Sequence, residues 1–380
     1  MSETPNSPMD DEEQQATDSI LLEDLREGLS GERAKRTKKP TDFDIADERV
    51  REYLASRSAP NLRINQKKLT EGSLATYESR LNEWVNFAEA KGYDILTIPD
   101  SELYRFIIFS VNSGLGAGTV GDKLSIIKGL YKYIDRVEGY ESVLCERDFE
   151  ISPELYTDSC PPDIEKEHIS EDEVACLFSA IDNDRDRLMV FVGLETGFRN
   201  SDIRNIKLKY TDLENQEITA HNPKGHNNAY TVPISKELAL ELQLWIHDGR
   251  ESLAQNKDTE HLFLTATGSG HLKTNGSLWK IVTDAAEKAG IQEIISERTY
   301  NNPYNKSGKV HKKYNRVTPH TLRHTFITLL EEKGIQLEYR QLLANHANPS
   351  TTQRYSHAKA KKMREARLRA NLYDDIDPVA

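Results

Sequence analysis

Apolar residues recur along the first half of the chain at the spacing of amphipathic helices. The clearest stripe has intervals of three and four residues, and it consists of Leu74, Tyr77, Leu81, Trp84 and Ala88. These intervals place side chains on one face of a helix, and Ser73 stands where a capping residue is expected. Similar stripes occur over residues 103–110 and 124–134. We therefore predict a helical domain over residues 43–145.

This pattern is interrupted over residues 146–169, which contain three prolines and little periodicity. We interpret this segment as a linker between two domains. Helical spacing then returns in four segments, at residues 170–181, 184–196, 236–247 and 277–289. Between them, Glu217–Ile234 has two strand-like runs separated by turn residues, which predicts a β-hairpin.

Residues 294–317 show no regular period and are interpreted as an irregular insertion before helices that resume at Pro319. The second domain is predicted to cover residues 170–372. The expected fold class is mainly α, with a helical first domain and a mixed, mostly α-helical second domain that carries a small β-hairpin or sheet.

Charge is distributed unevenly along the chain. Residues 1–42 contain no aromatic residue and are rich in acids, so we predict a disordered N-terminal tail. Residues 1–30 carry nine acids against one arginine, a net charge of −8, whereas residues 298–370 carry 16 lysines and arginines against four glutamates, a net charge of +12. The total net charge of −12 therefore leaves binding to a polyanion open.

Composition argues against several classes of protein. No run approaches the roughly 18–20 apolar residues that a membrane span requires, and no signal pattern precedes the first domain, so we expect no membrane partner. The three cysteines, Cys145, Cys160 and Cys176, form no CxxC pair. This cysteine usage fits a reducing cytoplasm better than a disulfide framework or a cysteine zinc site.

The densest chemical signal is the octapeptide TPHTLRHT, which begins at Thr318. Thr318 and Pro319 suit the start of a helix. His320 and Arg323 are three residues apart and are predicted to project from one face near that start, a place that favours anions. Each residue alone is unremarkable, because a single His or Arg is usually a surface or packing residue.

Two other clusters accompany this helix start, and together they resemble the active site of the tyrosine recombinase family, which includes phage integrases and Xer-type site-specific recombinases. That family has an Arg after Thr-Gly, a Lys in a β-hairpin, His-x-x-Arg, and Leu-Gly-His with a Tyr nine residues later. The matching positions are Arg199, Lys224, His320, Arg323, His346 and Tyr355. Asn345 and Phe198 depart from the usual Gly and Leu, but neither departure removes a reactive group.

The resemblance is strong over residues 165–370. It extends to residues 46–140, which are similar to the family's helical, SAM-like core-binding domain. It implies a DNA-binding domain at 43–145 and a catalytic domain at 170–372.

These residue types suit attack on a phosphodiester. The guanidinium groups of Arg199 and Arg323 match the non-bridging oxygens on which negative charge develops. The phenolic oxygen of Tyr355 is the candidate nucleophile. Lys224, at the tip of the hairpin, is the candidate acid that protonates the leaving 5′-oxygen.

His320 is placed to accept the tyrosine proton, and His346 to hydrogen-bond the phosphate. By resemblance, the enzyme is a site-specific recombinase or integrase that cuts and rejoins DNA through a 3′-phosphotyrosine intermediate without ATP. Because two arginines supply the charge that metals provide in many nucleases, we expect no metal and no cofactor.

The resemblance also implies double-stranded DNA as partner, a homo-tetramer on synapsed DNA and a cytoplasmic, nucleoid-associated location. The sequence identifies no accessory DNA-bending protein. The basic segment 356–368 is rich in helix formers. It forms either a helix on its own protomer or, by resemblance, a segment that docks on a neighbouring one.

Three other interpretations stay open. His320 and His324 are spaced like the zinc ligands of an H-E-x-x-H hydrolase, although Thr321 replaces the essential Glu. A catalytically silent DNA-binding protein on the same fold is a second alternative. A type IB topoisomerase is the third, because its chemistry is nearly identical, and the helical first domain favours a recombinase over it.

Overall fold

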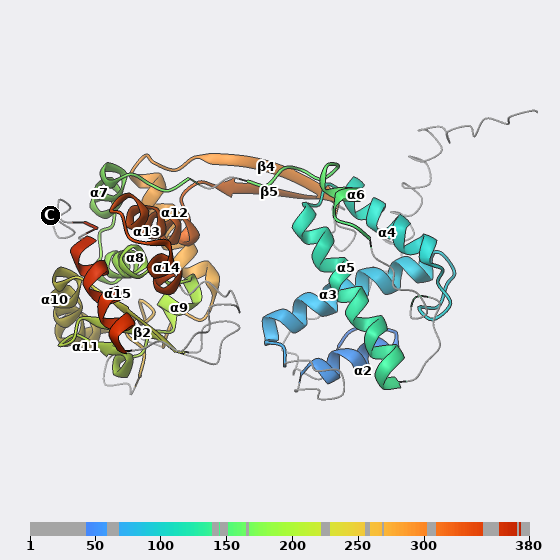
Figure 1. The fold of residues 1–380 in the computed structure, drawn as a ribbon, viewed down its shortest axis with the longest axis horizontal. Coiled ribbons are helices and arrows are strands. Elements are labelled where there is room, and N and C mark those ends of the chain that lie inside the picture. The colour runs from blue at the N-terminus through green and yellow to red at the C-terminus, as the bar shows by residue number, and fades with distance from the viewer. Residues whose placement is uncertain are drawn as a thin grey trace, which may run out of the picture. The chain divides into compact units, whose positions relative to one another are not determined.

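The computed structural model describes residues 43–58, 68–138, 144, 151–164, 167–221, 229–254, 259–267, 270–301, 309–344, 357–370 and 372–373. The chain divides into two compact units (Figure 1), Met1–Asp163 with Glu297–Lys312, and Ile164–Ser296 with Lys313–Ala380. Helices dominate both units, and the described strands form two small sheets, so the predicted fold class is confirmed.

The first unit is helical, with α2 (Glu48–Arg57), α3 (Glu71–Ala90), α4 (Asp100–Asn112), α5 (Ala117–Tyr133), the π-helical continuation η1 (Ile134–Glu138) and the short α6 (Glu154–Thr157). The predicted stripe of α3 is buried at Leu81, Trp84 and Ala88 and packs in the core of this unit. The helix begins earlier than predicted, because Thr70 is its N-cap and the Thr70 hydroxyl accepts a 3.3 Å hydrogen bond from the Ser73 amide.

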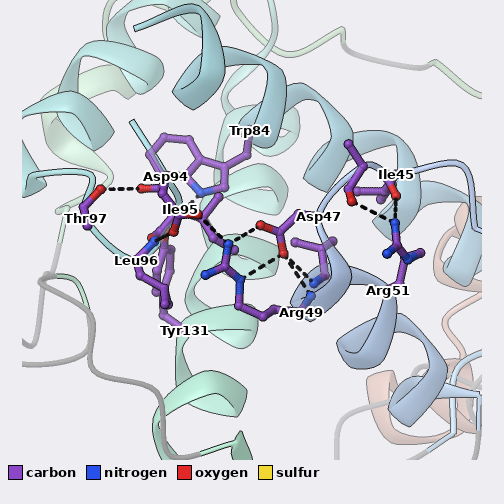
Figure 2. Close-up of polar contacts among 12 residues, drawn as sticks. Ile45, Asp47, Arg49, Arg51, Trp84, Asp94, Ile95, Leu96, Thr97 and Tyr131 are labelled. Atoms are coloured by element: carbon purple, nitrogen blue, oxygen red, sulfur yellow. Dashed lines mark hydrogen bonds and ion pairs between the residues drawn. The ribbon is translucent and has the colours of Figure 1, made fainter. Parts of the chain in front are cut away.

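Polar side chains join these helices to the loops between them (Figure 2). The Arg49 guanidinium, in the first turn of α2, lies 2.5 Å from Asp47 and 2.7 Å from Asp94. Trp84 donates a 3.2 Å hydrogen bond to the Tyr131 hydroxyl, which donates to a loop carbonyl. Because a buried polar group is costly unless it is paired, the buried Trp84–Tyr131 hydrogen bond helps to fix how α3 packs on α5.

The second unit is built around α8 (Asp184–Thr196), which is buried over most of its length. A helix that is apolar on all sides belongs at the centre of a domain. The helices that pack against it include α9 (Asn200–Arg204), α10 (Lys236–Leu244), α12 (Asn275–Lys288) and α13 (Pro319–Glu332). The other helical elements described are α7 (Glu171–Ser179), η2 (Leu208–Tyr210), η3 (Trp245–Gly249), α11 (Arg250–Ala254), α14 (Leu337–Leu343) and α15 (His357–Ala370).

A three-stranded antiparallel sheet contains the predicted hairpin. Its order is β1 (Thr211–Asp212), β2 (Glu217–Ala220) and β3 (Tyr230–Pro233). Ile218 pairs with Val232, and both side chains are buried on the same face. A slip of one residue would expose both, so burial sets this register.

The prediction of an irregular segment at 294–317 is wrong. Residues in this segment form a two-stranded sheet of β4 (Ile294–Asn301) and β5 (Lys309–Asn315). Both strands are largely exposed or half-buried. They therefore lack the apolar alternation by which a strand is recognised in a sequence.

The outer part of this hairpin, Glu297–Lys312, belongs to the first unit. There the Arg298 guanidinium donates to the Pro162 carbonyl. The hairpin backbone also approaches Gly114 so closely that a Cβ at that residue would lie 3.1 Å from the Thr299 carbonyl oxygen. Among the described helices of both units, none has the length and hydropathy needed to cross a bilayer.

Candidate active site

Arg199 follows a sharp turn at the end of α8. The helix closes at Gly197, whose φ of 61° is left-handed. A Cβ at this position would lie 2.3 Å from the Phe326 ring of α13, so both conformation and space require glycine. The turn reverses the chain so that Arg199 becomes the N-cap of α9.

Arg323 projects from α13 into the same region and is 5% exposed. Its Nη1 lies 2.5 Å from the Gly197 carbonyl oxygen, and its Nη2 donates to the Ala344 carbonyl at the end of α14. The guanidinium therefore joins the turn that carries Arg199 to the segment that leads toward His346.

The two arginines are close enough to influence one another. Burial, followed by the positive charge of Arg199, lowers the pKa of the Arg323 guanidinium. An arginine titrates so far above neutral pH that the group stays charged in spite of this shift. Beside the Asp202 carboxylate, these two guanidinium groups supply the planar forks of donors that match the oxygens of a phosphate.

Asp202 and Tyr230 complete this region, although the sequence had assigned them no role. The Asp202 carboxylate accepts hydrogen bonds from the Arg199 amide (3.2 Å) and from the Tyr230 hydroxyl (3.3 Å). Burial and the neighbouring Asp202 charge raise the pKa of Tyr230. The signal that could identify Asp202 is an acidic residue in the first turn of a helix, where Asp and Glu are enriched.

The start of α13 agrees with its prediction. Thr318 and Thr321 form a reciprocal capping arrangement, and Pro319 follows in the first turn. His320 and Arg323 nevertheless lie differently, because the imidazole of His320 is exposed whereas Arg323 is buried. The Nε2 atoms of His320 and His324 are 3.1 Å apart.

This histidine pair was also the candidate zinc site. In the part of the chain that the structure describes, no group of three or more His, Cys, Asp or Glu side chains could hold a metal ion. The described residues therefore do not add a third ligand to His320 and His324.

Lys224, His346 and Tyr355 lie outside the described residues. Their positions in the chain are bounded by described elements. Lys224 falls between the paired strands β2 and β3, and His346 falls three residues after the end of α14. Tyr355 precedes the first residue of α15 by two positions.

Comparison with known proteins agrees with the resemblance read from the motifs. Residues 167–362 match the phage integrase family, and residues 52–137 match the N-terminal SAM-like domain of phage integrases. Tyrosine recombinase XerA of Pyrococcus furiosus is 31% identical over 211 residues, which cover 55% of this chain and 63% of that protein. Tyrosine recombinase XerC of Oceanobacillus iheyensis is 26% identical over 314 residues, which cover 80% of this chain and 92% of that protein.

Solved structures share the fold. The Tn1549 transposon integrase in complex with transposon right end DNA is 17% identical, with a TM-score of 0.56 over 83% of this chain and 98% of that one. The XerH site-specific recombinase bound to palindromic difH is 20% identical, with a TM-score of 0.54 over 91% of this chain and 93% of that one. The chain thus spans less than two thirds of the length of the archaeal relative, yet nearly all of several recombinases. With more than half of its residues matched by the family model, the chain belongs to the phage integrase family of tyrosine recombinases.

Proposed function

We propose that this protein is a site-specific recombinase that cuts and rejoins duplex DNA through a 3′-phosphotyrosine intermediate on Tyr355. The observation that carries the proposal is the convergence of Arg199 and Arg323 at one turn. The Arg323 guanidinium is held by the Gly197 and Ala344 carbonyls, and the backbone of Arg199 is held by the capping carboxylate of Asp202. Charge placed before the reaction stabilises a transition state without the cost of reorganisation.

In this mechanism, the two guanidinium groups bind the non-bridging oxygens of the scissile phosphate. Tyr355 attacks phosphorus, and its proton passes to His320. Lys224 protonates the departing 5′-oxygen, which would otherwise leave as a costly alkoxide. His346 donates a hydrogen bond to the phosphate, and the retained phosphoester supplies the energy for rejoining. The positive charge comes from this chain's own side chains, so the proposal needs no metal and no cofactor.

The partner we propose is double-stranded DNA. The basic residues of 298–370 supply phosphate contacts, and the two solved recombinases described above are complexes with DNA. In chain order, we assign residues 1–42 to an acidic tail, residues 43–145 to DNA binding, residues 146–169 to a linker and residues 170–372 to catalysis. We also propose that the protein acts as a homo-tetramer on synapsed DNA. Its proposed location is the cytoplasm, in association with the nucleoid. The SAM-like match at 52–137 favours a recombinase over a type IB topoisomerase.

Adduct capture from a sequence library tests this assignment for any target site. The protein is incubated, in excess EDTA, with a library of nicked duplexes that have a randomised central segment. After cleavage, the short fragment between the cut and the nick dissociates, so the cut strand cannot be rejoined. We expect covalent protein–DNA adducts whose linked peptide contains Tyr355.

Tyr355→Phe should bind DNA and form no adduct, because it lacks one oxygen while its ring is retained. Arg323→Ala keeps the nucleophile and should slow adduct formation about a thousandfold or more. The matched control is Tyr339→Phe, which lies outside the motif and should react normally. An adduct mapped to Tyr339, or adducts formed by Tyr355→Phe, would disprove the assignment.

A further inference from the structure

The helix that follows the candidate nucleophile docks on its own catalytic unit. In α15, Arg367 is 1% exposed, and its Nη2 lies 3.0 Å from both the Oε2 and the carbonyl oxygen of Glu195. The side chains of the pair are 2% and 3% exposed, so this is a fully buried ion pair. A buried charge is tolerated only when it is well paired, and here each partner supplies the counter-charge of the other.

Glu195 connects the end of α8 to the segment that follows β3. It lies in the last turn of α8, four residues before Arg199, and its Oε2 also accepts a 2.8 Å hydrogen bond from the Ser235 amide after β3. A single carboxylate therefore links the arginine-bearing turn, the lysine-bearing hairpin and α15.

Arg367 also reaches the second catalytic arginine through packing. Its Cζ lies 5.7 Å from the centre of the Phe326 ring. Phe326 is three residues after Arg323 on α13, and its ring fills the space left by the missing Cβ of Gly197. Gly197 in turn holds Arg323 through its carbonyl. A displacement of Arg367 would thus be transmitted to both arginines through contacts between packed groups.

Other contacts of α15 are made within the same chain. Arg364 donates to the Glu217 carboxylate and to the Asn215 carbonyl, beside β2. Beyond the helix, the buried Tyr373 hydroxyl donates a 3.1 Å hydrogen bond to the Leu194 carbonyl of α8. These contacts hold α15 and the residues after it against β2 and α8.

We propose that Arg367 is a positioning residue for strand cleavage. Its ion pair with Glu195 latches the segment that begins two residues after Tyr355 onto the helix end that carries Arg199, within one subunit. This inference rests on the proposed function, in which Tyr355 is the nucleophile. Phosphoryl transfer depends steeply on the placement of the attacking atom, so loss of the latch should slow cleavage more than it weakens DNA binding.

The test compares Arg367→Met with Glu365→Gln, a loss of charge at an exposed position of the same helix that is not one of the proposed phosphate contacts. The probe is a nicked duplex recovered by adduct capture with the wild-type protein. We expect Arg367→Met to lower the single-turnover rate at saturating protein about tenfold to a hundredfold. The Kd of Arg367→Met for the duplex should change less than about twofold, and Glu365→Gln should react at the wild-type rate.

The Glu195→Gln variant removes the charge of the partner and keeps its shape. It therefore tests the ion pair even if the Arg367→Met protein does not fold. In a double-mutant cycle, Glu195→Gln with Arg367→Met should be no slower than Arg367→Met alone, because both changes remove one interaction. Arg367→Lys should restore part of the rate. Independent effects that multiply, or a folded Arg367→Met protein with the wild-type rate, would overturn the latch.

Amide hydrogen exchange of α15 separates this inference from the proposed function. Exchange in residues 357–370 should rise in both Arg367→Met and Glu195→Gln but not in Glu365→Gln. If the wild-type protein forms no adduct, the proposed function fails. The exchange rates of residues 357–370 then decide by themselves whether the Arg367–Glu195 pair holds α15 in place. If wild type forms adducts while α15 exchanges equally in all variants, the latch fails and the proposed function stands.

Discussion

Gly197 meets two constraints that other residue types cannot meet together. Its φ of 61° costs a residue with a Cβ about 1–2 kcal/mol, and the Phe326 ring stands 2.3 Å from where that Cβ would be. Overpacking of this kind adds about 1–3 kcal/mol. Because the carbonyl of Gly197 holds Arg323, strain here is also strain at the candidate active site.

We therefore expect Gly197→Ala to destabilise the protein by about 2–5 kcal/mol, measured by denaturant unfolding. The matched control is Gly290→Ala, at a φ of 73° where a Cβ would meet nothing within 4 Å. It should show the backbone cost alone, about 1–2 kcal/mol. Equal losses in the two variants would show that the Phe326 ring moves aside without cost.

The residues of the site differ in how well the sequence predicts them. Arg199, His320 and Arg323 belong to short motifs in which neighbouring residues also set the local structure, such as Thr318 and Pro319. Glu195 and Arg367 are 172 residues apart, and no local pattern connects a basic residue on an apparently solvated helix with one particular acid. Such a pair exists only once the chain has folded.

Among helices and strands, those with one buried apolar face are the ones that the sequence pattern predicts. The stripes of α3 and α5 repeat with helical period because one side of each helix lies in the core. The hairpin of β2 and β3 has a buried Ile218 and Val232 beside turn residues, so its sequence predicts it. The strands β4 and β5 have no such face, so their polar sequence predicts an irregular segment instead.

The hairpin of β4 and β5 leads directly into α13, and an ion pair holds the junction. Arg316 lies 2.7 Å and 2.8 Å from the two carboxylate oxygens of Glu173, in the first turn of α7. The hydrogen bond from Arg316 holds the pKa of Glu173 below its ordinary value. The ionised pair therefore stabilises the fold above the unfolded-state pKa, and this contribution is lost as pH falls through the lower folded-state value.

Thermal unfolding across pH tests this junction. Glu173→Gln should melt below wild type near neutral pH, and the gap should narrow as pH falls from about 6 to about 3. The control is Asp172→Asn, an exposed acid in the same helical turn. A gap between wild type and Glu173→Gln that stays constant over this range would show that the lost stability comes from packing rather than from charge.

At the scale of the whole molecule, the chain carries opposite charge at its two ends. Residues 1–30 have a net charge of −8 and residues 298–370 have a net charge of +12. Binding of DNA phosphates by the basic region releases counterions, so affinity should fall steeply as salt rises. An acidic segment in the same chain is a competitor for the same basic side chains, and its effective concentration is high because it is tethered.

Removal of residues 1–30 should therefore leave duplex affinity unchanged or strengthen it. Any gain should be largest at low salt and should shrink as the Debye length falls below about 10 Å. The matched control keeps the tail at full length with its nine acidic residues replaced by Asn and Gln, and it should behave like the truncation, because the competition depends on charge and not on the chain itself. Fluorescence anisotropy with a labelled duplex across a salt series measures both effects. A clear loss of affinity on truncation, at any salt concentration, would show that the tail contributes contacts of its own to the DNA complex.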